Sequence, residues 1–334
     1  MFDIGIIGAG PVGIFSVFQA GMMGLRCALI DALPMIGGQC SALYPEKPIY
    51  DIPGYAQISA QGLIDNLYKQ ARPFTPTLFL NQRVTALNKN SDDNFVIHTS
   101  SNNQITCNTT IIAAGCGAFG PNRPSIDNIS DFENKSVFYS VTHRNLFINK
   151  RIIIAGGGDS AVDWALSISE IASQVYLIHR RNKFKAMPES INKLHKKIES
   201  GDIELITPYQ LHNIHGKGGM LSSVDVIDLD NNILNIEADF LLPFFGLSTD
   251  LGEVKNFGLE LVDNKRIKVD SKNMQTNLEG VFAVGDIAQY PGKLKLILTG
   301  FAEAALACHS AHTIINHGAE THFEYSTTTG VPIG

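Results

Sequence analysis

Two glycine-rich turns, each lying between an apolar run and a helical segment, constrain the fold of this chain more than any other feature. The first turn, Gly8–Gly13, follows the apolar run 3–7 and opens a helical segment over about 11–23. The second turn, Gly156–Ala161, follows the apolar run 151–155 in the same way and opens a helical segment over about 159–172. A strand, a glycine-rich turn and a helix in this order are typical of a parallel sheet that binds a dinucleotide at the turn.

Physical chemistry explains why such a turn is rich in glycine. They permit a tight bend and a close approach of the backbone to a pyrophosphate, while the helix that follows supplies free N–H groups and a positive dipole. A glycine pattern alone is a weak signal, because glycines often serve only close packing. Here the flanking strand and helix support the interpretation at both turns.

The residue at the end of the strand after each helical segment indicates which cofactor each site binds. Asp31 follows Gly8 by 23 positions (31 − 8), and His179 follows Gly156 by the same 23 positions (179 − 156). A carboxylate accepts hydrogen bonds from a ribose hydroxyl and repels a 2′-phosphate, whereas arginines bind a phosphate through charge-assisted bonds. Asp31 therefore predicts FAD or NAD at the first site. Arg180 and Arg181, which follow His179, predict NADPH at the second site.

A third glycine motif favours FAD at the first site. The apolar run 281–284 ends in Gly285-Asp286 before a helical run over about 299–316. A carboxylate at this strand end can hold ribityl hydroxyls, and the following helix directs its N-terminus toward a pyrophosphate. Together with the first turn, this motif indicates a flavoprotein with two dinucleotide sites.

The order of these motifs predicts a discontinuous first domain. The expected fold class is α/β, with two Rossmann-like, three-layer ββα domains and the second inserted into the first. The FAD-binding domain is predicted at 1–116 and 244–334, and the NADPH-binding domain at 117–243. Breaker-rich stretches at 115–124 and 243–246 mark the two crossings.

Charge and cysteine content exclude several other classes. The net charge is −6 and the pI near 5.9, so no basic field indicates nucleic acid or an anionic membrane. The five cysteines are odd in number and none has CxxC spacing, which predicts neither a metal site nor a disulfide framework. The apolar N-terminal stretch has no basic residue before Arg26, so we expect a soluble, cytoplasmic protein rather than a secreted one.

One long segment resembles a known family. Residues 37–54 read GGQCSALYPEKPIYDIPG and resemble the GGQ-x-x-ALYPEK-x-IYD-x-x-G segment of thioredoxin-reductase-like ferredoxin or flavodoxin–NADP⁺ reductases. The segments 179–186 and 295–305 resemble the NADPH-phosphate segment and the flavin-side helix of that family. The resemblance runs over essentially the whole chain.

The resemblance also implies roles for single residues. Tyr50 is expected to stack on one face of the isoalloxazine ring, with the nicotinamide arriving at the other face. The family tail, usually HSTS, here reads YSTT from Tyr325, so Tyr325 and Thr327 are expected to reach the flavin of a partner subunit in a homodimer. The residues expected to bind cofactor are Gly8, Gly10, Pro11, Val12, Gly13, Asp31, Gly38, Gln39, Tyr44, Tyr50, Val84, Ala114, Gly115, Phe119, Gly156, Gly158, Asp159, Ser160, Ala161, His179, Arg180, Arg181, Lys185, Gly285, Asp286 and Thr327.

The cysteine positions narrow the chemistry. Thioredoxin reductases carry a CxxC shortly before the second turn, but here that neighbourhood, 139–143, reads YSVTH. Relatives of glutathione reductase carry a CxxxxC in the first domain, but here Pro45 follows Cys40 five positions on. Without a dithiol, the flavin is expected to deliver electrons directly to an external carrier.

These inferences predict an FAD-dependent oxidoreductase that moves a hydride from NADPH to FAD and then single electrons to ferredoxin or flavodoxin, or the reverse. The sequence does not choose between the two carriers. Two alternatives remain open, an NAD(P)H oxidase or quinone reductase, and a non-catalytic flavin-bearing redox sensor. The basic segment 179–197, with Lys293 and Lys295, is the candidate docking surface for an acidic carrier.

Overall fold

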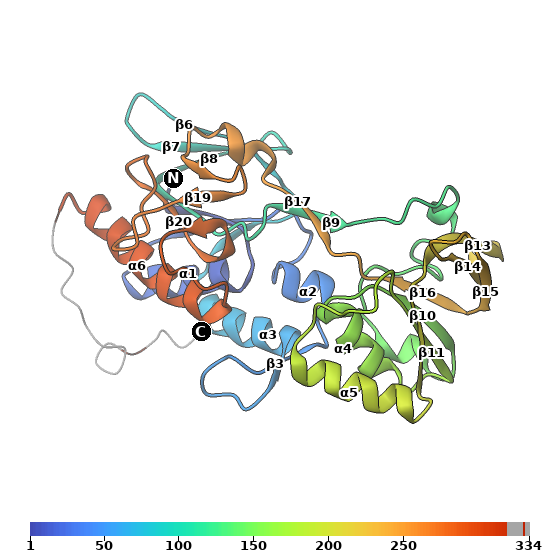
Figure 1. Ribbon diagram of the computed structural model, residues 1–334. Coiled ribbons are helices and arrows are strands. Elements are labelled where there is room, and N and C mark those ends of the chain that lie inside the picture. Colours follow the sequence, from blue (N-terminus) through green and yellow to red (C-terminus); the bar gives the residue numbers. More distant parts are fainter. Residues whose placement is uncertain (319–329, 331–334) are drawn as a thin grey trace. The chain divides into compact units, whose positions relative to one another are not determined.

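The computed structural model describes residues 1–318 and Gly330. Its contacts divide the chain into two compact units, the first formed by Met1–Phe119 with Thr249–Gly334 and the second by Gly120–Ser248. The first unit is therefore assembled from both ends of the chain (Figure 1).

A parallel sheet forms the centre of the first unit. Strand β1 (Phe2–Ile7) lies between β2 (Cys27–Ile30) and β8 (Gln104–Ile112). Beyond them, β5 (Thr77–Phe79) pairs with β2, and β20 (Val281–Ala283) pairs with β8. The side chains of β2 and β20 are buried on both faces of the sheet, which is why these two strands read as unbroken apolar runs in the sequence.

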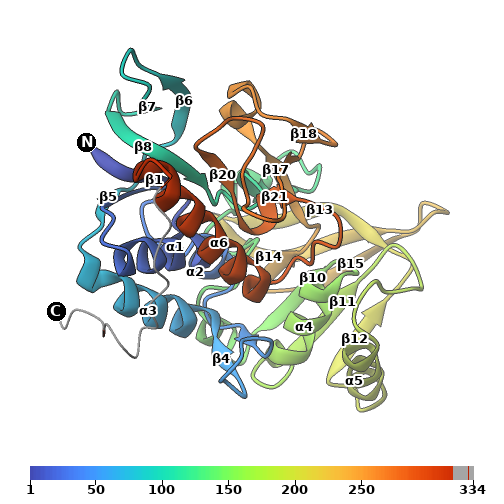
Figure 2. The same cartoon turned by 90° about the vertical axis from the view of Figure 1, so that its left-hand side faces the viewer.

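An antiparallel meander and a helical layer complete this unit. Strand β8 continues into the meander with β7 (Phe95–Thr99) and β6 (Val84–Lys89). Helices α1 (Pro11–Met22), α3 (Ala60–Ala71) and α6 (Ile297–Ile315) lie side by side (Figures 1 and 2). The short remaining elements are α2 (Gln39–Leu43), β3 (Pro48–Ile49), β4 (Ile58–Ser59), β18 (Leu261–Val262), β19 (Arg266–Lys268) and β21 (Ala288–Gln289).

The second unit repeats this plan with fewer strands. Its parallel sheet has the order β12 (Ile203–Ile206), β11 (Gln174–Ile178), β10 (Arg151–Ala155) and β16 (Phe240–Pro243). Its helices and antiparallel meander are α4 (Asp159–Ile168), α5 (Pro188–Glu199), β13 (Gln210–Lys217), β14 (Met220–Ile227) and β15 (Ile233–Glu237). The predicted α/β class with a parallel sheet in each unit is confirmed.

Helix α4 is shorter than the sequence predicts. It was expected to reach about residue 172, but it ends at Ile168. The N–H groups of Ile171 and Ala172 both bond to the carbonyl of Ile168, so the chain turns there toward β11 instead of extending the helix. The apolar side chains at 171 and 172 pack on the core as part of this turn rather than on a helix face.

The two crossings between the units are paired with each other. Strands β9 (Ala118–Pro121) and β17 (Leu247–Asp250) form a two-stranded sheet. Asn122 follows β9 and donates its backbone N–H to the carbonyl of Gly246 at 3.0 Å. Its side-chain amide donates to the carbonyl of Phe245 at 3.2 Å.

Within the described residues, no helix is long and apolar enough to cross a membrane.

Candidate dinucleotide-binding sites

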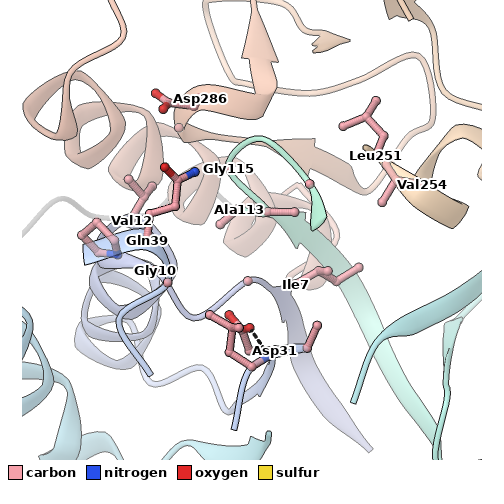
Figure 3. A pocket seen from close by; sticks show the side chains of 18 of the residues that line it. Ile7, Gly10, Val12, Asp31, Gln39, Ala113, Gly115, Leu251, Val254 and Asp286 are labelled. Atoms are coloured by element: carbon pink, nitrogen blue, oxygen red, sulfur yellow. Dashed lines mark hydrogen bonds between the residues drawn. The ribbon is translucent and has the colours of Figure 1, made fainter. Parts of the chain in front are cut away.

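A cavity of about 510 Å³ opens in the first unit where β1, β2 and β8 end (Figure 3). Its lining comes from both parts of the unit, since residues 250–254 and 285–286 join those of the N-terminal part. In an open parallel sheet, ligands bind at the carboxyl ends of the strands. Predicted cofactor residues in the lining are Gly8, Gly10, Pro11, Val12, Asp31, Gly38, Gln39, Tyr44, Val84, Ala114, Gly115, Gly285 and Asp286.

The glycines of the first turn have different structural roles. Gly8 has φ +109°, and a Cβ there would lie 2.4 Å from the carbonyl oxygen of Ala113. A Cβ on Gly13 would lie 1.8 Å from the carbonyl oxygen of Gly8, so Gly13 lets α1 pack on the turn and is not part of the cavity lining. Gly10 has no atom within 4 Å of its would-be Cβ. This open space at the start of α1 fits a pyrophosphate close to the backbone.

Asp31 is fixed at the cavity edge by the backbone. Its carboxylate accepts the N–H of Ala9 at 2.6 Å and the N–H of Leu33 at 2.8 Å. Asp31 is labelled among the lining residues in Figure 3. Burial raises the pKa of this carboxyl above its ordinary value, although the two backbone bonds oppose the shift. Each carboxylate oxygen can accept a further hydrogen bond, so the arrangement suits a ribose with free hydroxyls.

The lining has a second acidic group, well separated from Asp31. In Figure 3 Asp286 lies at the far end of the cavity from Asp31, and Gly10 lies between them. Gln39 contributes an amide on the same side as Asp286. Burial raises the pKa of the Tyr44 hydroxyl, which accepts a hydrogen bond from the thiol of Cys40 at 3.7 Å. The cavity therefore offers polar groups along a long ligand.

Several lining residues carry no sequence motif. Leu251 and Val254 give the cavity an apolar wall, and they belong to the segment that follows the return crossing. Arg83 and Lys295 are exposed cations at the rim, suited to phosphate oxygens. Arg83 could have been inferred from its neighbour Val84, but nothing in the local sequence marks Leu251 or Val254.

Some predicted residues are not brought to this cavity. Tyr50 follows β3, is 67% exposed and is absent from the lining. The side chain of Phe119 is outside the described part of the structure, as are Tyr325 and Thr327. Their roles remain predictions.

In the second unit, Gly156 and Ala161 occupy the closely packed positions that Gly8 and Gly13 occupy in the first unit. A Cβ on Gly156 would lie 2.6 Å from the carbonyl oxygen of Phe244 and 2.9 Å from the Cβ of Ala161. A Cβ on Gly158 would meet only the carbonyl oxygen of Lys185, at 3.9 Å. The turn therefore keeps one tightly packed glycine and one more open glycine before α4.

The basic segment folds back on this turn. The N–H of Lys185 donates to the carbonyl of Gly157 at 2.7 Å, and the N–H of Met187 donates to the Asp159 carboxylate at 2.8 Å. The side chains of Arg180, Arg181 and Lys185 are exposed beside it. Exposed cations on a segment whose backbone is held against the turn before α4 suit a phosphate, and their role in binding NADPH stays a prediction.

His179 is used in packing. Its ring stacks on Phe184 with centroids 5.3 Å apart, and a Cβ on Gly157 would lie 2.2 Å from that ring. Burial, with the neighbouring arginine charges, lowers the pKa of His179 below its ordinary value. The imidazole therefore stays neutral near pH 7, and the arginines supply the positive charge.

The expectation that Lys293 offers a free charge for docking is wrong. Its side chain is only 2% exposed and forms an ion pair with Glu303 of α6. In the second unit, Lys197 is paired with Asp202 at 3.0 Å, and Lys193 lies 3.7 Å from Glu189. Local ion pairs thus take up part of the charge that the sequence alone counts as a basic patch.

The fold is similar to that of several solved structures. A thioredoxin reductase from Lactococcus lactis has a TM-score of 0.78 and 24% identity, covering 95% of this chain and 100% of that one. A thioredoxin reductase from T. acidophilum has a TM-score of 0.77 and 24% identity, covering 94% and 98%. These similarities show the fold.

All five cysteines of this chain are free thiols, and among the described residues no group of His, Cys, Asp and Glu could hold a metal ion.

Sequence comparison shows the family. A protein named ferredoxin–NADP reductase from Rickettsia akari is 57% identical over 98% of this chain and 97% of its own length. A protein of the same name from Rickettsia prowazekii is 55% identical over 97% of each chain. A profile of the pyridine nucleotide-disulphide oxidoreductases matches residues 2–305. With two dinucleotide turns and this match, the chain belongs to the pyridine nucleotide-disulphide oxidoreductase family.

Proposed function

We propose that this protein is a ferredoxin–NADP⁺ reductase that binds FAD in the cavity of the first unit and NADPH at the turn of the second. The observation that carries the proposal is the contrast between Asp31 and the segment His179-Arg180-Arg181, which begins at the equivalent place of a similar turn. The names of the relatives at 55–57% identity support the choice of carrier. When bound, FAD supplies the chemistry that joins the two-electron donor NADPH to a one-electron carrier.

In the first unit, the protein binds and orients the flavin cofactor. Asp31 accepts hydrogen bonds from the adenosine ribose, and the start of α1 at Gly10 receives the pyrophosphate. Asp286 lies at the other end of the cavity, where it can hold the ribityl hydroxyls. Tyr50 offers an exposed ring for stacking on the flavin. Tyr325 and Thr327, which lie outside the described residues, are proposed to reach the flavin of a partner subunit in a homodimer.

In the second unit, charge selects the cofactor. Arg180 and Arg181 bind the 2′-phosphate of NADPH, and Lys185 adds a third cation whose backbone is held against Gly157. A hydrogen bond to a charged group contributes about 1.5–3 kcal/mol, so loss of two such bonds separates NADPH from NADH by about two orders of magnitude or more. His179 supports the turn and leaves the phosphate to the arginines.

The electron acceptor is ferredoxin or flavodoxin, and the cytoplasm is the proposed location. Cys40, the cysteine that lines the cavity, has Pro45 where a redox-active partner cysteine would stand. All five thiols are free. These thiols therefore form no disulfide relay, and the reduced cofactor has to pass electrons directly to a small redox protein.

Steady-state turnover of the purified yellow protein tests this proposal. NADPH should support rapid reduction of ferredoxin or flavodoxin and slow reduction of oxygen and quinones. NADH should be used much less efficiently. Faster turnover with oxygen or a quinone than with either carrier would identify an oxidase or quinone reductase instead. Bound FAD without NADPH-dependent turnover would identify a redox sensor, and purification without any flavin would contradict the proposal altogether.

A further inference from the structure

Helix α6 holds a carboxylate that the proposed function has not used. The Glu303 side chain is 2% exposed and does not line the cavity. One of its oxygens, Oε2, accepts the backbone N–H of Gly285 at 2.7 Å. The other, Oε1, accepts the hydroxyl of Tyr290 at 2.7 Å and forms the ion pair with Lys293. A buried charge with this complete a set of partners indicates a specific structural task.

The first partner belongs to the turn that carries Asp286. Gly285 has φ +75°, in the left-handed region, and its N–H is directed at Glu303. Helix α6 approaches this turn closely, because a Cβ on Gly300 would lie 2.4 Å from Val12 and 3.4 Å from the Cα of Gly285. The hydrogen bond from Gly285 therefore fixes the orientation of a turn whose Asp286 lines the cavity.

The other two partners fix the loop that leads into α6. Tyr290 and Lys293 lie on the segment between β21 and α6, and the Lys293 ammonium is 5.6 Å from the centre of the Tyr290 ring. The same segment continues to Lys295 and Leu296, which line the cavity. Glu303 thus joins the Gly285 turn to the rim of the same cavity.

We propose that Glu303, Lys293 and Tyr290 form a positioning network for the FAD site. The two carboxylate oxygens divide the task, with Oε2 holding the Asp286 turn and Oε1 holding the loop that carries Lys295. None of the three side chains needs to touch the cofactor. The inference rests on the proposed function, because it assumes that the cavity of the first unit binds FAD.

Because each carboxylate oxygen of Glu303 has its own partners, replacing the carboxylate with the amide of glutamine tests the network. Glu303→Gln keeps the size of the side chain but has a single acceptor oxygen and an NH₂ group. Leaving the buried Lys293 ammonium without an acceptor costs more free energy than leaving the Gly285 N–H without one, so the amide oxygen stays with Lys293. The NH₂ group then faces the N–H of Gly285, and two hydrogen-bond donors oppose each other. The turn must shift. When Lys293→Met is added, the amide oxygen is free to accept from Gly285, and the NH₂ can donate to the Tyr290 oxygen.

The experiment measures the FAD dissociation constant of refolded or flavin-stripped protein by the quenching of flavin fluorescence. We expect about a tenfold weaker FAD affinity for Glu303→Gln, with a shifted visible absorbance band of the bound flavin, and recovery to within about threefold of the wild type for Glu303→Gln/Lys293→Met. Ile105→Ala, in the buried part of the meander and outside the cavity lining, is the matched destabilised control. It should lower the melting temperature and leave the FAD affinity unchanged.

Two results would overturn the inference. One is a Glu303→Gln protein that binds FAD as the wild type does, and the other is a double variant no better than the single variant. If Glu303→Gln does not fold, the double variant decides alone, and near-wild-type affinity supports the network while loss of binding contradicts it. Failure of the wild type to bind FAD would instead refute the proposed function, so the two failures are distinguishable.

Discussion

The two glycine-rich turns of this chain sit in equivalent places of two similar sheets. Strand β1 lies between β2 and β8, and β10 lies between β11 and β16. The first glycine of each turn is crowded by the backbone just after the neighbouring strand, since a Cβ would meet the carbonyl oxygen of Ala113 at Gly8 and that of Phe244 at Gly156. The backbone requirement is therefore the same in both units.

The difference lies in how the next strand supports the turn. Asp31 accepts a hydrogen bond from Ala9, the second residue of its turn, whereas His179 packs its ring on Gly157, the second residue of the other turn. Ala9 can carry a Cβ because the contact with Asp31 goes through its N–H. Gly157 cannot, because the imidazole occupies that space. The same position in the fold thus supports the turn in both units. In the proposed function, the charge that selects the ligand comes from Asp31 itself in the first unit and from the arginines after His179 in the second.

The largest expected effects come from placing a side chain at the first glycine of each turn, which tests whether the two turns bind different cofactors. Gly8→Val places a side chain at φ +109° and 2.4 Å from a carbonyl oxygen, so we expect FAD binding to weaken by at least about 100-fold. Gly156→Val should leave the flavin bound and abolish NADPH binding. Flavin content per chain and NADPH titration check both. Gly24→Ala, with a positive φ but open space, is the control and should bind both cofactors normally; loss of flavin in the Gly156 variant would break the comparison.

The arginines should account for cofactor choice in the second turn. Removing both in Arg180→Ala/Arg181→Ala is expected to raise the Kd for NADPH by about 100-fold, because two charge-assisted bonds are lost, while the Kd for NADH changes little. The wild-type affinity for NADPH should also fall with salt, and that of the variant much less. Lys196→Ala removes one exposed charge from α5 and serves as the control. An equal loss for NADH and NADPH would show that the arginines do not read the 2′-phosphate.

The contact between His179 and Gly157 predicts a smaller effect with an internal rescue. Gly157→Ala forces a methyl group to within 2.2 Å of the imidazole, and overpacking of this kind costs about 1–3 kcal/mol, so the Kd for NADPH should rise about tenfold. Adding His179→Ala makes room and should recover most of the affinity. In the first turn, Ala9→Gly should change FAD affinity little. If His179→Ala gave no rescue, the imidazole would have to contact the cofactor directly.

Much of the first unit follows from residue pattern, because strands buried on both faces and glycine turns are local features. The strand Cys27–Ile30, the turn at Gly8 and the position of Asp31 are all local features of this kind. The apolar wall at Leu251 and Val254 is different, since it depends on where the chain returns after an inserted unit. No periodicity or motif encodes that return.

The buried pair of Glu303 and Lys293 illustrates the same limit for charge. The sequence places Lys293 in a candidate docking surface, and Glu303 falls only within the family-like segment 295–305, so neither pattern predicts that the two residues pair. The structure buries both side chains at 2% exposure. Whether a charge is free depends on partners brought together by the tertiary fold, which is why counting lysines overestimates the available basic surface.

The two supporting side chains also predict opposite responses to pH in the cofactor-free protein. Burial raises the pKa of Asp31 above its ordinary 3.8, so the folded state holds that proton more tightly, and stability falls as pH rises through the raised value. Burial lowers the pKa of His179 below its ordinary 6.5, so the unfolded state takes up the proton first, and stability falls as pH drops below 6.5 toward the folded value. Asp31→Asn should remove the first trend and His179→Gln the second. Urea unfolding followed by the fluorescence of Trp164, which is the only tryptophan and is buried in the second unit, isolates the His179 effect. A wild-type profile that His179→Gln leaves unchanged on the acid side would show that the imidazole is as free in the folded unit as in the unfolded chain.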